Sequence, residues 1–238
     1  NVTLPANKTL YLSGPLTLGM VSQENGVIFR NNGKITDEGE NQEQFAIDTP
    51  DSLVLNVPSP TPATGTLTIK KSSEGYLGYK VGIAQVAENS TQNNTSQQNG
   101  GSFVQPMYNN GIIDFKGPNS IGMYVYLPTT LGATNTTFDG TLLNSGNITL
   151  TGKESYGMKM AGKTGTNAKY ENAGTITLKK NVKDAADGSA GMALMDDSTV
   201  VSVNLAAGVA KNSGTIKLEN VKNSLGTYVN INSDITNT

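Results

Sequence analysis

The sequence contains neither cysteine nor histidine, and Arg30 is its single arginine. Without cysteine the chain has no disulfide and no thiolate metal site, so a repeated backbone ladder must supply its stability. Without histidine it lacks the commonest general base, the Ser-His-Asp triad and imidazole metal ligands. These absences exclude most nucleophilic and zinc chemistry, and we expect no cofactor and no metal.

Charge is also scarce in this chain. Charged residues make up 15% of it, below the average of about 25%. The net charge is −2, so there is no basic footprint for nucleic acid or for an anionic membrane. There is no run of the ~18 apolar residues that a membrane helix needs, and we expect no direct membrane insertion. Both termini lie in repeat-like sequence, so we expect a fragment of a longer protein.

A short motif recurs throughout the chain. Its copies are NNGKITD, ATGTLTI, NNGIIDF, NSGNITL, NAGTITL and NSGTIKL, which begin at Asn31, Ala63, Asn109, Asn144, Asn172 and Asn212. Their glycines are separated by 32, 46, 35, 28 and 40 residues, so a constant core alternates with inserts of variable length. Repetition of this kind is typical of a solenoid.

The spacing within each copy predicts a strand. Apolar residues lie two apart, as in Ile176 and Leu178, and period two is the pattern of a strand. The same parity places on the inner face the glycine of each copy and the asparagine that five of the six copies carry. We therefore expect the glycine to permit a bend and the asparagines of successive copies to form a stacked amide ladder.

A second motif follows the first after 11 to 17 residues. Its copies are NSIGMYVYL, ESYGMKMAG, GSAGMALMD, NSLGTYVNI and, more loosely, GYLGYKVGI, aligned on Gly122, Gly157, Gly191, Gly226 and Gly78. The residues one and three positions after the glycine are mostly apolar and should face inward. The residue two positions after it should then face outward.

Together the two motifs predict an all-β fold, a parallel β-helix with about three strands per coil. We expect one domain over residues 1–238 with about six coils. Residues 1–26 would form an N-terminal cap or an additional coil, and residues 86–106 a flexible insertion.

The outward row supplies the candidate ligand-binding residues, which are Tyr124, Tyr126, Lys159, Tyr228 and Lys80. Exposed aromatic rings beside polar donors suit the face of a sugar or a protein partner. The alternative is that a loop covers these side chains or that they stack on neighbouring coils.

Carboxylates offer the one remaining route to catalysis. Asp184, Asp187, Asp196 and Asp197 lie around a single loop, whereas glycosidic cleavage needs two carboxylates at a defined separation. A calcium site at Asp196 and Asp197 competes with the simpler reading of solvated turn charges. We therefore predict no catalytic residue and no enzyme, and we keep a polysaccharide-degrading β-helix as an alternative.

The NSGTIKL-like strands, the S-x-G-M/T-Y/K strands and the Asn-rich, Cys-free composition resemble the passenger repeats of bacterial type V autotransporters. They look most like those of large fusobacterial outer-membrane adhesins, over roughly Val27 to Asn230. The resemblance implies a right-handed β-helix that is exported through an outer-membrane barrel. It also implies a place at the cell surface, anchored by a C-terminal barrel outside this chain.

The same resemblance implies adhesion, and with it a role in virulence. The partner would be a glycan or receptor on host cells or other bacteria, bound through loops and outward rows. A purely structural stalk that projects a distal tip is the alternative. The long heptad stalk of trimeric adhesins is absent, so we expect a monomer.

Overall fold

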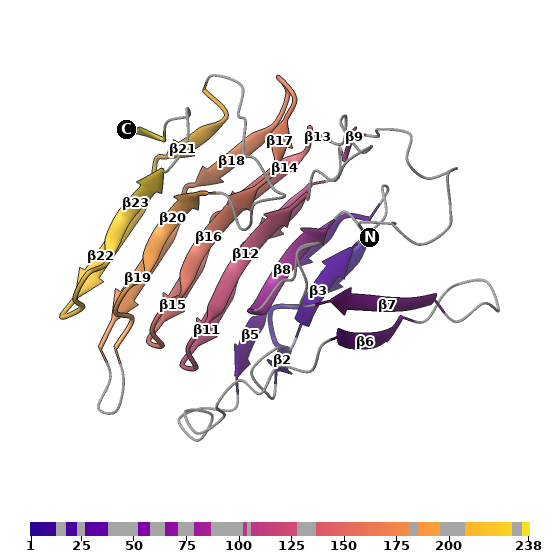
Figure 1. The fold of residues 1–238 in the computed structure, drawn as a ribbon, viewed down its shortest axis with the longest axis horizontal. Coiled ribbons are helices and arrows are strands. Elements are labelled where there is room, and N and C mark those ends of the chain that lie inside the picture. Colours follow the sequence, from indigo (N-terminus) through magenta and orange to yellow (C-terminus); the bar gives the residue numbers. More distant parts are fainter. Residues whose placement is uncertain are drawn as a thin grey trace.

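In the computed structural model most of the described residues form β-strands. The described residues are 1–12, 18–22, 27–37, 52–57, 65–70, 79–86, 102–103, 106–127, 137–180, 185–195, 208–229 and 235–238. Three parallel sheets of seven, six and six strands run from one end of the stack to the other (Figure 1). The predicted parallel β-helix is therefore confirmed.

Each of these three sheets takes one strand from each coil. Sheet A contains β1 (Val2–Leu4), β4 (Phe29–Asn31), β10 (Met107–Asn109), β14 (Thr141–Asn144), β18 (Lys169–Asn172), β21 (Ala210–Asn212) and β24 (Thr236–Asn237). Sheet B contains β2 (Thr9–Leu12), β5 (Lys34–Asp37), β11 (Ile112–Phe115), β15 (Asn147–Leu150), β19 (Thr175–Lys179) and β22 (Thr215–Glu219). Sheet C contains β3 (Leu18–Ser22), β8 (Lys80–Val86), β12 (Ser120–Tyr126), β16 (Tyr156–Ala161), β20 (Ala190–Leu194) and β23 (Leu225–Val229).

We number the coils by their strands. Coil 1 is β1, β2 and β3, coil 2 is β4, β5 and β8, coil 3 is β10, β11 and β12, coil 4 is β14, β15 and β16, coil 5 is β18, β19 and β20, and coil 6 is β21, β22 and β23. Coil 1, whose strands lie within residues 1–26, stands at the N-terminal end of all three sheets. In the part of the chain that the structure describes, no helix has the length and apolar character needed to cross a bilayer.

The core consists of columns of like side chains that repeat from coil to coil. Ile35, Ile113, Ile148 and Ile176 are register partners in sheet B, and none of them is exposed. Each coil buries its apolar side chains on the equivalent side chains of the next coil. This stacking explains why the same period-two pattern recurs along the sequence.

The predicted amide ladder is present at the bend between sheets A and B. The Nδ2 atom of each asparagine donates to the Oδ1 atom of the asparagine in the next coil, over 2.7–2.8 Å from Asn31 to Asn212. Asn212 donates onward to Asn237 over 3.3 Å, a member that the sequence reading missed. Asn109, Asn144 and Asn172 are fully buried, so these bonds satisfy amides that have no access to water.

One predicted copy of the first motif lies outside the coils. Strands β6 (Ser52–Val57) and β7 (Gly65–Lys70) pair with each other as an antiparallel hairpin. Strand β5 pairs directly with β11, so coil 3 stacks on coil 2 and the hairpin stands apart from the stack (Figure 1). The prediction that ATGTLTI forms a coil is wrong. Ala63 stands where the other copies carry the asparagine that joins the ladder.

The alignment of the second motif on Gly78 is also wrong. The register pairs Lys80 with Ser120, so Gly82, and not Gly78, is the equivalent of Gly122. A Cβ atom on Gly82 would lie 2.7 Å from the carbonyl oxygen of Gly122, which is why this column consists of glycines. Gly78 and Gly82 are four residues apart and therefore share a parity, so alternation alone does not choose between them.

Further strands occupy the connections between coils. Strands β9 (Ser102–Phe103), β13 (Thr137–Phe138) and β17 (Lys163–Thr164) form a small parallel sheet. Of the predicted flexible insertion at 86–106, residues 87–101 and 104–105 lie outside the described residues.

Candidate functional site

The row predicted to be exposed lies inside the protein. Tyr124 and Lys159 are 0% exposed, Lys80 is 1% exposed and Tyr126 is 3% exposed, whereas Tyr228 is partly buried. Every residue of β12 is buried, so this strand of sheet C is covered on both faces. The prediction of exposed rings and amines is therefore wrong for these four residues, which present almost no surface to a ligand.

Lys159 is held by three tyrosine rings. Its Nζ atom lies 4.6 Å from the ring centre of Tyr79, 4.7 Å from that of Tyr156 and 5.5 Å from that of Tyr124. It also donates a 3.4 Å hydrogen bond to the hydroxyl of Tyr79. Tyr79 precedes coil 2's β8, Tyr124 belongs to coil 3, and Tyr156 and Lys159 belong to coil 4. The attraction between a desolvated cation and aromatic rings contributes about 2 kcal/mol to stability. Because the residues of this cluster come from coils 2, 3 and 4, the attraction links these three coils.

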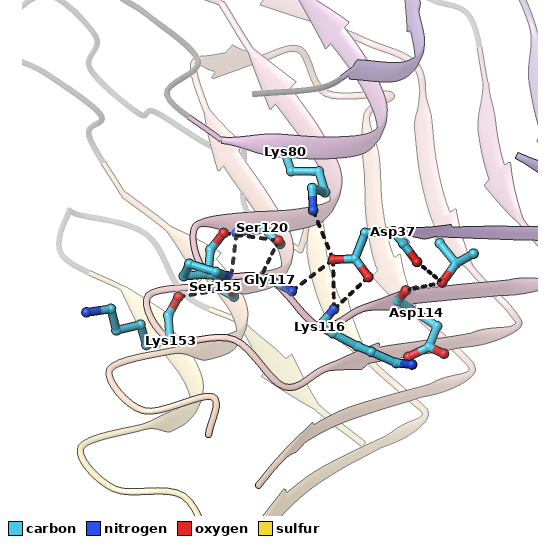
Figure 2. Close-up of polar contacts among 10 residues, drawn as sticks. Asp37, Lys80, Asp114, Lys116, Gly117, Ser120, Lys153 and Ser155 are labelled. Carbon is cyan, nitrogen blue, oxygen red and sulfur yellow. Dashed lines mark hydrogen bonds and ion pairs between the residues drawn. The ribbon is translucent and has the colours of Figure 1, made fainter. Parts of the chain in front are cut away.

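Lys80 forms a buried ion pair with Asp37 (Figure 2). Its Nζ atom lies 2.9 Å from Oδ2 of Asp37, and the two side chains are 1% and 0% exposed. The same carboxylate accepts hydrogen bonds from the backbone N–H groups of Lys116, at 3.0 Å, and Gly117, at 2.8 Å. Burial lowers the pKa of the Lys80 amine, and the charge and hydrogen bond of Asp37 oppose that shift.

The ion pair replaces two residue types that the other coils repeat. Asp37 is the register partner of Leu12 and continues the column that holds Phe115 and Leu150. Lys80 pairs with Ser120, the first of the column of serines. At these two positions coil 2 therefore carries an acid and a base, where coils 3 and 4 carry an apolar residue and a serine. These residues lie where the chain leaves coil 2 for the β6–β7 hairpin and where it returns.

The serine column itself forms a second ladder. The backbone N–H of Ser120 donates to Oγ of Ser155 over 3.0 Å, that of Ser155 to Oγ of Ser189 over 2.9 Å, and that of Ser189 to Oγ of Ser224 over 3.2 Å. Figure 2 shows its first two members beside the ion pair. The sequence reading missed this ladder, although its signal, S-x-G, was present in four copies of the second motif.

Comparison with known families decides what kind of domain carries these features. The family model of the BigA third pectate lyase-like domain matches residues 1–238. The chain belongs to this family. Members are β-helix domains of a large bacterial surface protein, in agreement with the three parallel sheets. Comparison with curated proteins and with solved structures gives no match.

The pectate lyase-like name of the BigA family directs attention to the carboxylates. Of the four predicted candidates, Asp184, Asp196 and Asp197 lie outside the described residues. Asp187 is described, and its Oδ1 atom accepts a 2.7 Å hydrogen bond from the exposed backbone N–H of Lys222, which is a turn contact. Within the described ranges, no three acidic side chains gather closely enough to hold a metal ion.

Proposed function

We propose that this BigA-family domain is a non-enzymatic segment of an autotransporter adhesin. It acts as a monomer, is displayed at the bacterial outer membrane, and binds a glycan or receptor on host cells or other bacteria. One observation carries the proposal. The chain is a β-helix of a surface-protein family, and the register of its strands is the same before and after long inserts. Coil 3 pairs with coil 2 in sheets A, B and C although residues 38–79 intervene between β5 and β8. A stack that tolerates such inserts is suited to display them.

The absence of catalysis in this proposal rests on the residues of the chain. Histidine and cysteine are missing, and the most buried carboxylate among the described residues, Asp37, is paired with Lys80 and with two backbone N–H groups. A catalytic acid or base needs access to a substrate, which this carboxylate lacks. Incubation with a panel of polysaccharides tests this part of the proposal, and release of any product contradicts it.

Attachment of the purified domain to cells tests adhesion. The domain is expected to bind epithelial cells or partner bacteria in a saturable manner. A matched control replaces residues 38–79 with the four residues 116–119 that make the corresponding connection in coil 3. Retention of the thermal unfolding midpoint in this control shows that its β-helix is intact. If the domain attaches to no cell, the adhesin proposal is wrong.

One observation favours a structural stalk as the second candidate. Four of the five predicted contact residues are buried. Lys159 contacts rings from two other coils and Lys80 pairs with Asp37 of its own coil, and such internal contacts are the role of a scaffold. The two functions differ in the effect of deleting residues 87–101, the part of the insertion that leaves strands β8 and β9 in place. A stalk keeps full cell attachment of the parent protein after this deletion, whereas an adhesin that uses this insertion loses it.

A further inference from the structure

An exposed corner between sheets A and B carries polar and aromatic side chains that lie outside the buried core. We define the corner patch as Arg30, Asn32 and Lys34 of coil 2 together with Tyr108, Asn110 and Ile112 of coil 3. The register pairs Arg30 with Tyr108 and Lys34 with Ile112, so the two triplets run side by side. Neighbouring strands lie about 4.8 Å apart, so the two triplets are close enough for one sugar ring to contact both.

Arg30 is an oriented and uncompensated cation. Its guanidinium carbon lies 4.4 Å from the ring centre of Tyr108, and the side chain is exposed. In the described part of the chain Arg30 forms no ion pair, whereas Lys34 pairs with Asp114 at 3.4 Å. A guanidinium stacked on a ring presents a planar fork of N–H donors, and this fork matches a carboxylate with two parallel hydrogen bonds.

Two exposed amides lie next along the same corner. The Nδ2 atom of Asn110 donates to Oδ1 of Asn32 over 3.0 Å, which fixes the orientation of both groups. Among the described residues, Nδ2 of Asn32 and Oδ1 of Asn110 have no protein partner, so the pair offers one donor group and one acceptor. Ile112, 42% exposed, adds apolar surface beside them.

We propose that the corner patch binds a carboxylated sugar of a surface glycan. Arg30 holds the carboxylate, Asn32 and Asn110 bind hydroxyl groups, and Ile112 contacts the C–H face of the ring. This inference rests on the proposed glycan adhesion and names its ligand class. The acid group comes from a sialic acid or from a uronic acid, which share the carboxylate that Arg30 recognises.

Binding to two acid and neutral pairs tests the inference. The purified domain is titrated with sialyllactose and with lactose, and separately with glucuronate and with glucose, while its backbone amide resonances are followed by NMR. At least one acid is expected to shift the resonances of residues 30–34 and 108–112, and its neutral counterpart is not. Shifts with sialyllactose alone or with glucuronate alone identify the source of the acid.

Three variants assign the effect to the patch. Arg30→Gln is expected to weaken binding by roughly ten- to a hundredfold because it removes a charged hydrogen-bond donor, and Arg30→Lys by less. Lys217→Gln removes an exposed positive charge from coil 6 and is expected to change nothing. Equal binding of acid and neutral sugars, no binding of either acid, or full binding by Arg30→Gln overturns the inference. If the domain attaches to cells but binds neither acid, the patch is wrong and the adhesin proposal stands.

Discussion

Breaking the buried Asp37–Lys80 pair from either side is expected to destabilise the protein strongly. Asp37→Ala leaves a buried amine and two backbone N–H groups without their acceptor, and Lys80→Ala leaves a buried carboxylate without its cation. Removal of one partner of a buried ion pair costs about 3–5 kcal/mol. In a chain of this size, each kcal/mol lowers the melting temperature by about 2–4 °C, so each variant is expected to melt roughly 6–20 °C lower.

Replacing both partners with the residues of the other coils is expected to restore most of the loss. The double variant Asp37→Leu, Lys80→Ser continues the columns that contain Leu150 and Ser120. In the double variant the backbone N–H of residue 116 can donate to the carbonyl of residue 37. The equivalent bond exists in the next coil, where the N–H of Thr151 donates to the carbonyl of Phe115 over 3.0 Å. Replacement of a buried ion pair by packed residues is often neutral or stabilising, so we expect stability within about 1 kcal/mol of the parent.

Urea unfolding of the four proteins, followed by circular dichroism, completes this double-mutant cycle. The reasoning is refuted if each single variant loses less than about 1 kcal/mol, or if the double variant loses the sum of the two singles.

The pH dependence of stability gives a second check. Because the pKa of Lys80 is lowered in the folded state, the unfolded chain binds more protons between that lowered pKa and 10.5. Stability therefore rises with pH through this window, and the double variant should lack this rise.

Three further changes probe other parts of the stack. Asn144→Ala breaks the ladder between Asn109 and Asn172 and is expected to cost about 2–5 kcal/mol in urea unfolding, whereas Asn110→Ala, in the exposed amide pair, should cost less than about 1 kcal/mol. Gly157→Ala places a Cβ atom 2.6 Å from the carbonyl oxygen of the equivalent glycine in coil 5, and an unchanged melting temperature would contradict the expected loss of about 1–3 kcal/mol. Burial raises the pKa of Tyr170 well above 10.0, so the unfolded chain loses this proton first and stability should fall above pH 10.0. Tyr170→Phe should flatten that alkaline decline.

The coil architecture was predictable because its signals are local and repeated. Asn144, Asn172 and Asn212 each precede a glycine by two residues and an isoleucine by four, so one strand, one bend and one ladder position can be read from a single copy. Six coils were expected from six motif copies; five of these copies lie in coils 2 to 6, whereas coil 1 contains no copy. The copy at Ala63 shows the limit of this reading, because an apolar alternation without the asparagine satisfies the strand pattern but not the stack.

The candidate site was less predictable because it depends on contacts between distant residues. Alternation places Tyr124 and Lys159 opposite the inward methionines, but alternation does not say whether the second face of a sheet is covered. The ion pair had a visible signal, since Asp37 ends KITD where the other copies end in leucine, isoleucine or phenylalanine. Its partner Lys80 could not be recognised, because the alignment of the second motif on Gly78 did not place Lys80 opposite Ser120, where the register puts it.

The amide ladder also forms a row of dipoles that run in one direction along the stack. Its side-chain N–H groups point from each coil toward the next one, as from Asn109 to Asn144. At the same bend the backbone donates in the opposite direction, since the N–H groups of Gly146 and Gly174 bond to the carbonyls of Asn109 and Asn144 in the preceding coil. The two rows of dipoles therefore oppose each other, unlike the aligned peptides of an α-helix, which build a macrodipole. At this bend each added coil contributes one dipole in each direction, so the two rows offset each other as the stack lengthens.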